Sequence, residues 1–143
     1  MTLDKKVTES GAKAHQRDDE EWRVKPYSLW HRKLDKSLYM LDVDFVEWRY
    51  RKGIPVAVGV MEVTRVDNGI TVNDQYLDAI IRRFESRDFQ ATATRIVAES
   101  LKTKAYIILF REDCSEFWVY NLSERNGWVG YNPDEMEDFL KSL

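Results

Sequence analysis

The chain has 143 residues, a length that fits one domain with a sizeable core. Charged residues make up 33% and aromatic residues 13%, which is typical of a soluble globular protein, and the net charge of −3 excludes a bulk attraction for nucleic acid. The single cysteine, Cys114, excludes an internal disulfide, and no apolar run approaches the ~20 residues of a membrane span. Since the start also lacks an apolar signal segment, we expect a cytoplasmic protein with no membrane partner.

The start of the chain differs in composition from the rest. Residues 1–21 are mostly charged or small and predict a flexible N-terminal arm, whereas residues 22–143 predict a single domain. Its first element is a helix within Trp22–Leu34, which Pro26 should restrict to the part that follows this proline.

Two apolar runs with a turn between them predict an antiparallel hairpin. Leu38–Tyr50 and Ile54–Thr64 each alternate as strands, and the residues around Gly53 provide the turn. Alternation places Asp42 and Asp44 on the same face of the first strand.

A long helical stretch follows from about Asn73 to Lys102, with a break near residues 86–88. Its second half carries one apolar stripe, which we expect to be buried. The stripe consists of Phe89, Ala93, Ile96, Val97 and Leu101.

The last third of the chain predicts two strands and a helix. Ala105–Phe110 is a continuous apolar run, typical of a strand covered on both faces, and Glu116–Asn121 is its expected partner. Asn132 and Pro133 are typical of a helix start, and this helix should extend to Leu143. The predicted class is therefore α/β: a central mixed β-sheet flanked by helices, with Ala105–Phe110 parallel to the hairpin.

Acidic residues inside apolar strands are the most distinctive feature of the chain. Asp42 and Asp44 lie in the first strand, and Glu62 shares a face of the second with Val58 and Val60. An unpaired buried charge costs several kcal/mol, so acids on adjacent strands indicate a shared cation. Asp44 and Glu62, with Asp42 as an alternative or additional ligand, would hold Mg²⁺ (or Mn²⁺) through the oxygen ligands that this ion prefers.

With these residues the chain resembles the PD-(D/E)XK nuclease superfamily, over roughly Trp22–Tyr120. The resemblance rests on the strand around Asp44, the strand ending in Met61-Glu62-Val63-Thr64, and the helix and strand that follow. It matches the family's order of helix, three strands, helix and strand if Leu38–Tyr50 bends or splits in two. It implies a restriction-endonuclease-like core and a magnesium-dependent nuclease acting on DNA, branched or structured DNA included, with metal-activated water as the nucleophile.

The resemblance assigns the metal to Asp44 and Glu62, but Thr64 stands where the family has the lysine of its E-x-K motif. That lysine orients water and offsets charge building on phosphorus, and threonine brings no charge. The positive group would then come from another element, and the sequence does not choose among Lys52, Arg65 and Arg95. The resemblance also places Gln90, at the start of the next helix, in the catalytic set with Asp44, Glu62 and Thr64.

Aromatic and basic residues predict contacts with nucleic acid, with DNA as the expected partner. They are Trp30, His31, Arg32, Lys33 and Lys52. More positive charge lies near the helix expected to flank the site, at Arg82, Arg83, Arg87 and Arg95. A domain of this size has little surface for recognition, so a homodimer or a partner subunit is also expected.

Other interpretations stay open at this point. A catalytically degenerate nuclease fold, without its lysine, would act as a nucleic-acid-binding or protein-interaction module. In an unrelated α+β adaptor, the acids would be structural. Asp42 and Asp44 could also simply face solvent, balanced by Arg49 and Arg51. His31 and Cys114 carry weaker catalytic signals, because a lone helical histidine is more often a surface residue and the cysteine has no nearby base.

Overall fold

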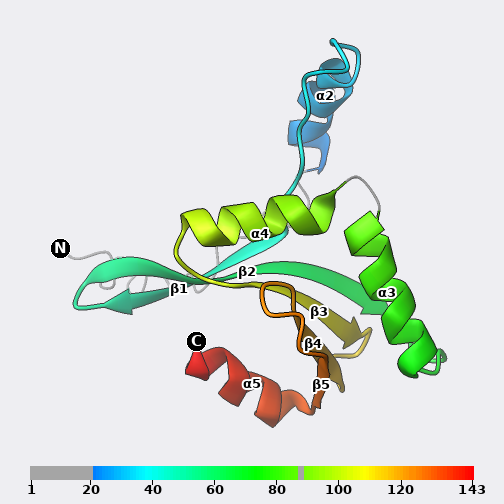
Figure 1. Cartoon of the computed structure of the whole chain (residues 1–143), viewed down its shortest axis with the longest axis vertical. Coiled ribbons are helices and arrows are strands. Elements are labelled where there is room, and N and C mark those ends of the chain that lie inside the picture. Colours follow the sequence, from blue (N-terminus) through cyan, green and yellow to red (C-terminus); the bar gives the residue numbers. More distant parts are fainter. Residues whose placement is uncertain (1–20, 87–88) are drawn as a thin grey trace. The chain divides into compact units, whose positions relative to one another are not determined.

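The computed structural model describes residues 21–86 and 89–143 (Figure 1). They belong to two compact units, one with residues 21–42 and 52–54 and the other with residues 43–51 and 55–143. The predicted arm, residues 1–21, lies outside the described residues except for Glu21. In the described part of the chain, no helix is both long enough and apolar enough to cross a bilayer.

The first unit contains helix α2 (Glu21–His31). The prediction that Pro26 would restrict the helix to the residues after it is wrong, because Pro26 lies inside α2. Proline has φ near the helical value, so its cost inside the helix is one lost N–H donor and a steric contact of its ring with the preceding turn.

The predicted strand over residues 38–50 is wrong in its first half, because the strand begins only at Phe45. The side chains of Leu38 and Tyr39 are both 53% exposed. A strand needs a neighbour to take its backbone hydrogen bonds, and alternation of side chains alone does not supply one. The inference that Asp42 and Asp44 share one face of a strand therefore fails, since neither residue is in a strand.

The second unit is built on a five-stranded mixed sheet with the order β1-β2-β3-β4-β5. The strands are β1 (Phe45–Arg51), β2 (Ile54–Val66), β3 (Ala105–Arg111), β4 (Phe117–Asn121) and β5 (Trp128–Tyr131). The predicted parallel pairing of β3 with the hairpin is confirmed, and β4 lies antiparallel to β3. Strand β5 escaped prediction because it has only 4 residues, among them Gly130.

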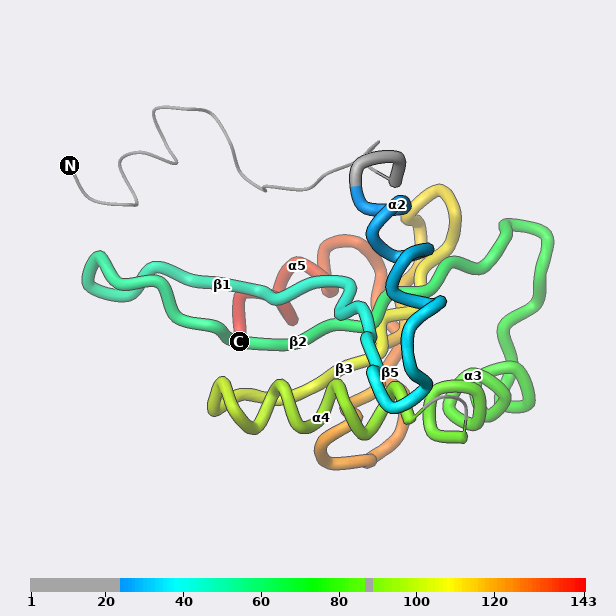
Figure 2. The backbone as a smooth tube through the Cα atoms, turned by 90° about the horizontal axis from the view of Figure 1, so that it is seen from above, coloured from blue at the N-terminus to red at the C-terminus, as the bar shows by residue number. Residues whose placement is uncertain are grey.

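Helices cover both faces of this sheet, which confirms the predicted α/β class (Figures 1 and 2). The predicted helical stretch forms two helices, α3 (Asp74–Ser86) and α4 (Gln90–Ser100), in agreement with the predicted break, and both lie on one face. Helix α5 (Pro133–Ser142) lies on the other face. It begins as predicted, with Asn132 Oδ1 accepting from the Glu135 backbone N–H at 2.8 Å in a capping box.

Side-chain alternation along β2 and β3 separates two hydrophobic cores. Val60 and Ile107 belong to the core under α3 and α4, whereas Met61 and Ile108 belong to the core under α5. Because side chains of a strand alternate between faces, Glu62 points to the α3–α4 face together with Val60. This confirms the predicted face for Glu62.

The predicted apolar stripe of α4 is wrong for most of its residues, although Val97 packs against the core. The buried residues of this helix are Ala91, Thr94 and Ala98, whereas Phe89 is 51% and Ile96 57% exposed. Small residues allow the helix to approach the sheet closely, so α4 packs through the side that has the least hydrophobic bulk. The close approach is what brings Thr94 within reach of Glu62.

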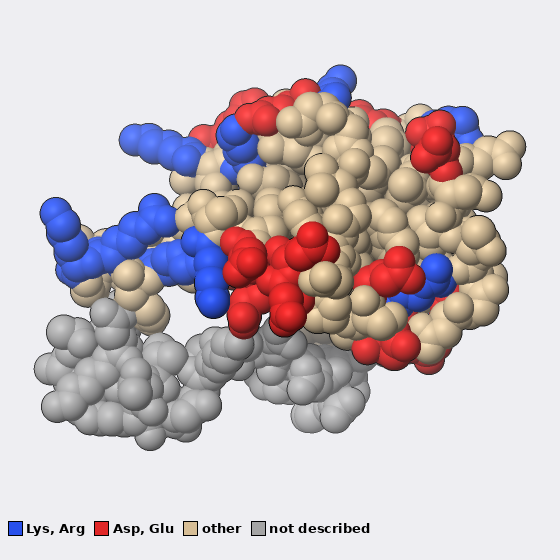
Figure 3. Space-filling model, turned by 90° about the horizontal axis from the view of Figure 1, so that it is seen from below, with Lys and Arg blue, Asp and Glu red and all other residues tan. Residues whose placement is uncertain are grey.

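Helix α5 is fixed at its end by strand β1. Arg51 Nη2 donates to the Leu143 oxygen at 2.7 Å, and Arg49 Nη2 donates to the Leu140 carbonyl. Cations at a helix C-terminus satisfy its last carbonyl groups and offset the helix dipole. On this side of the sheet, acidic side chains gather over α5 (Figure 3). The acidic residues of α5 are Asp134, Glu135, Glu137 and Asp138.

Candidate active site

Glu62 is a fully buried carboxylic acid near the centre of the sheet, with 0% exposure. It lies on β2 and pairs in register with Ile107 of β3. Helix α4 supplies its partners: Gln90 Nε2 donates to Glu62 Oε2 at 2.9 Å, and Thr94 Oγ1 lies 2.9 Å from Glu62 Oε1. Both carboxyl oxygens are thus held by one helix, which fixes the orientation of the side chain.

The Thr94 hydroxyl lies between two acceptors. It is 2.9 Å from Glu62 Oε1 and 2.8 Å from the Gln90 carbonyl oxygen. A hydroxyl has one hydrogen to donate, so Thr94 shares this hydrogen between the Glu62 carboxyl oxygen and the Gln90 carbonyl oxygen. Because Thr94 donates to Glu62, this contact favours the ionised form of the carboxyl group.

Asp44 meets this site from the residue that precedes β1. Its Oδ2 accepts from the Val63 backbone N–H at 2.9 Å. Val60 N–H bonds to the Lys104 carbonyl on the β3 side, so by alternation Val63 N–H faces the β1 side. The Asp44 carboxylate therefore takes the donor that a longer β1 would have used, which explains why the strand starts after it.

The two carboxyl groups influence each other. The pKa of Glu62 is raised to about 7, chiefly by burial and also by the nearby Asp44, while the hydrogen bonds from Thr94 and Gln90 partly offset this rise. A buried carboxylate beside a second carboxylate lacks a counter-charge. This electrostatic deficit is what a bound cation would remove.

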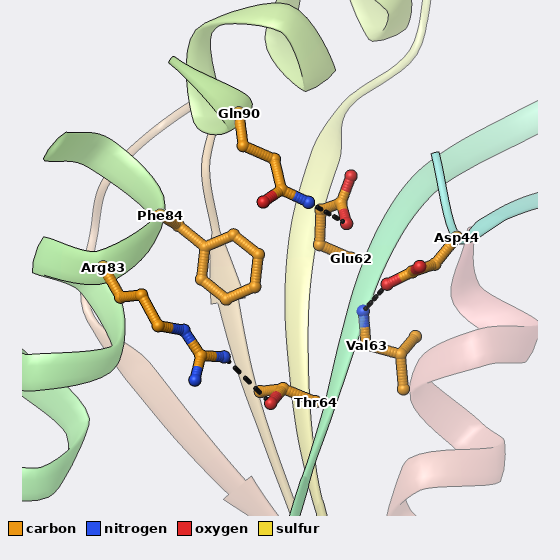
Figure 4. Close-up of a pocket in the computed structure, with 7 residues that line it drawn as sticks. All are labelled: Asp44, Glu62, Val63, Thr64, Arg83, Phe84 and Gln90. Carbon is orange, nitrogen blue, oxygen red and sulfur yellow. Dashed lines mark hydrogen bonds between the residues drawn. The ribbon is translucent and has the colours of Figure 1, made fainter. Parts of the chain in front are cut away.

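Asp44 and Glu62 line one pocket of about 280 Å³ (Figure 4). Its lining residues are Asp44, Glu62, Val63, Thr64, Arg83, Phe84 and Gln90. The four residues predicted as catalytic, Asp44, Glu62, Thr64 and Gln90, are therefore brought together. They come from the segment before β1, from β2 and from the first turn of α4.

Arg83 is the residue of this pocket whose role sequence reasoning missed. It lies in the last turn of α3, and its Nη2 donates to Thr64 Oγ1 at 3.0 Å. Its guanidinium carbon lies 5.2 Å from the centroid of the Phe84 ring. The sequence placed Arg83 among several basic residues near the site, and no pattern in the chain singled it out.

None of the three cations named as replacements for the lysine is among the residues that line the pocket. Arg95 is engaged by Glu85, with Nη1 to Oε1 at 2.5 Å. Arg65 is exposed, with Nε 3.7 Å from Asp67 Oδ1. Lys52 belongs to the first unit.

The remaining predicted site residues also belong to the first unit. Asp42 is exposed, and it is not among the residues lining the pocket. Trp30 is 53% exposed on α2, with its ring centroid 5.6 Å from that of Tyr27. His31, Arg32 and Lys33 end this helix or follow it directly. Trp30, Arg32 and Lys33 are exposed and His31 is partly exposed. Their contacts with nucleic acid stay a prediction.

The donor set of the pocket suits a hard divalent cation. Asp44 and Glu62 offer carboxylate oxygens, and Mg²⁺ commonly takes one or two carboxylates and completes its shell with water and phosphate oxygens. Within residues 21–86 and 89–143, no group of three or more His, Cys, Asp and Glu side chains forms a metal cluster. Two carboxylates are too few for a closed structural metal site. They fit an ion whose remaining ligands come from water and substrate.

Comparisons with protein-family models, with curated proteins and with solved structures gave no match for this chain.

Proposed function

We propose that this protein is a metal-dependent nuclease that hydrolyses phosphodiester bonds of DNA, built on a restriction-endonuclease-like core. The proposal rests on one observation: Asp44 and Glu62 converge on a single pocket from separate segments, with Glu62 fully buried. Folding buries the Glu62 carboxyl group next to the exposed carboxylate of Asp44 only at a cost, and such pairs are concentrated where proteins bind ions or carry out chemistry.

Asp44 and Glu62 would hold Mg²⁺ or Mn²⁺. When bound, the ion would lower the pKa of a coordinated water and polarise a phosphate oxygen. The chain contributes rigid placement of the two ligands: Val63 N–H holds Asp44, and Thr94 with Gln90 holds Glu62. Such supporting hydrogen bonds to metal ligands typically matter by about 10- to 100-fold in metal affinity or activity.

Gln90 has a second role in this proposal. Its amide nitrogen donates to Glu62, and its amide oxygen has no hydrogen-bond partner among the described residues. An amide oxygen at the pocket can accept a hydrogen from a water molecule and so orient its lone pair. Gln90 would thereby position the attacking water next to the carboxylates.

A nucleic-acid-binding module without catalysis is the second candidate. Thr64, at the position of the family's motif lysine, favours it, since threonine has no charge to offset the developing negative charge on phosphorus. Both candidates use an acidic pocket, but only the nuclease needs the ion for turnover. The acidic surface of α5 is unsuited to a phosphate backbone, so in both cases we expect DNA on the α3–α4 side of the sheet.

The test compares cleavage of supercoiled plasmid and branched DNA in Mg²⁺, Mn²⁺ and EDTA. The wild-type protein should cleave in either metal and not in EDTA. Asp44→Asn and Glu62→Gln should each lower the rate by about 100-fold or more. Glu99→Gln, which removes an exposed carboxylate from α4, is the matched control and should cleave like the wild type.

Binding of Mn²⁺ and of DNA, measured alongside, separates the two candidates. A wild-type protein that binds DNA but shows no metal-dependent cleavage would support the binding module. A wild-type protein that neither binds Mn²⁺ nor cleaves would rule out the nuclease.

A further inference from the structure

We infer that Arg83 and Thr64 form the anion-binding half of this pocket and take a non-bridging oxygen of the substrate phosphodiester without needing the metal. The inference rests on the proposed function, because it concerns the same pocket. Arg83 would be the substrate-binding residue, and Thr64 the residue that positions it.

The first support is that the hydrogen-bonding capacity of Arg83 is largely unused. A guanidinium has five N–H donors, and one hydrogen bond of Arg83 is seen, from Nη2 to Thr64 Oγ1 at 3.0 Å. No carboxylate within the described residues pairs with it. By contrast, Arg95 of the next helix is fully engaged by Glu85 through two contacts, at 2.5 and 3.1 Å. Arg83 therefore keeps an uncompensated positive charge at the pocket.

The second support is how Arg83 is held. The Phe84 ring lies beside its guanidinium at 5.2 Å, and Figure 4 shows this ring between Arg83 and Gln90. The ring separates the cation from the Glu62 end of the pocket, so the two charges do not simply neutralise each other. A planar guanidinium fixed in this manner matches the geometry of phosphate oxygens.

The third support is the division of charge within the pocket. Asp44 and Glu62 form one end and suit a cation, whereas Arg83 at Thr64 suits an anion. A phosphodiester group coordinated by a divalent ion combines a cation and an anion in one ligand, and the pocket offers groups for both. The pocket volume of about 280 Å³ leaves room for a phosphate group together with a hydrated ion.

Thr64 acquires a role different from the one expected of it. Its hydroxyl oxygen accepts a hydrogen bond from Arg83. We therefore assign to Thr64 the positioning of Arg83 and not the orientation of a water molecule. Threonine is β-branched and stiff at χ1, and here it lies in a strand paired on the β3 side. Its hydroxyl therefore gives the long arginine side chain a fixed anchor.

The test uses dimethyl phosphate as the probe, titrated into the full-length protein in EDTA. Binding is followed by NMR through the arginine Nε–Hε signals, and the signal missing from Arg83→Ala identifies Arg83. In the wild type this signal should shift and saturate. Arg83→Ala should weaken binding by about 10- to 100-fold, and Thr64→Val by roughly 2- to 10-fold.

Arg82→Ala is the matched control. Arg82 precedes Arg83 on α3, is exposed and does not line the pocket, so its loss changes the net charge equally. This variant should bind dimethyl phosphate like the wild type. Equal weakening in Arg82→Ala and Arg83→Ala, or wild-type binding in Arg83→Ala, would overturn the inference.

Mn²⁺ binding distinguishes direct phosphate binding by Arg83 from a purely structural role of this residue. If Arg83 only supported the fold of the pocket, its loss would weaken the binding of both ligands. Arg83→Ala should bind Mn²⁺ as tightly as the wild type or slightly more tightly, because a nearby positive charge has been removed. Arg83→Lys should recover part of the phosphate binding, since it keeps the charge but not the planar fork. A parallel loss of Mn²⁺ and phosphate binding in Arg83→Ala would contradict the separation into two halves. If the wild type binds no Mn²⁺, the proposed function fails, and the titration in EDTA still decides the anion site.

Discussion

Glu62 should make the stability of this protein depend on pH. Burial, and then the charge of Asp44, raises its pKa to about 7 in the fold, from an ordinary value of 4.5. The folded state thus binds this proton more tightly than the unfolded state. The contribution to the free energy of unfolding is complete below about pH 4.5, falls as pH rises through 7, and is then lost, a difference on the order of 3 kcal/mol.

Glu62→Gln should remove this dependence. A glutamine cannot ionise, and its amide nitrogen can donate to Thr94 while its oxygen accepts from Gln90. Urea unfolding at pH 5 and pH 8 should therefore show a variant close to the wild type at pH 5 and more stable than it at pH 8. Glu99→Gln serves as the exposed control. A variant that is destabilised equally at both pH values would show that Glu62 does not titrate as described.

Individual residues of the pocket were predictable to different degrees. Glu62 and Asp44 stood out because carboxylates are rare in apolar surroundings, and that signal is local to the sequence. Arg83 carried no such signal, because its contact with Thr64 joins residues 19 positions apart on separate elements. Asp42 looked equivalent to Asp44 only through an alternation that the backbone does not follow.

At the scale of elements, the packing of α4 predicts that substitutions at a small residue cost more stability than truncation of a large apolar one. The hydrophobicity of the residues alone would predict the opposite order. Ala98 is fully buried against the sheet, whereas Ile96 is 57% exposed. Ala98→Leu should therefore overpack the interface and lower the free energy of unfolding by about 1–3 kcal/mol. Ile96→Ala should cost less than about 1 kcal/mol. Urea unfolding of both variants checks this, and a larger cost for Ile96→Ala would restore the apolar stripe as the buried face.

The errors in the predicted elements share a physical cause. The sequence of α4 favours its bulky apolar residues as the buried face, but the distance between helix and sheet selects small ones such as Ala91. The alternating run before Phe45 has the pattern of a strand, but a strand also needs a partner in space. Where local pattern and packing agree, as at the Asn132 capping box and the buried strand β3, the prediction is confirmed.

At the scale of the whole molecule, the α/β class could be predicted from the sequence, because it follows from the order of strands and helices along the chain.

The predicted contacts of α2 and the residues after it with DNA are open to a direct test. An Arg32→Ser/Lys33→Ser double variant should weaken DNA binding and lower the slope of log affinity against log salt by up to about 2, since each phosphate contact contributes about 0.9. Fluorescence anisotropy over a salt series measures both quantities.

Lys141→Ser is the control for that experiment, because it removes an exposed positive charge from the acidic helix α5. It should leave the slope unchanged. If the double variant and the control behave alike, residues 32 and 33 do not contact phosphates.

The carboxyl proton of Glu62 gives the pocket an internal reporter. Below about pH 7 this carboxyl group is mainly protonated, so an ion that binds it must displace the proton into solvent. Infrared spectra should therefore lose the stretching band of a protonated carboxylic acid as the ion is added. The Thr94 hydroxyl already donates to the same carboxyl group, so the charge that the ion meets forms beside a donor that is in place beforehand.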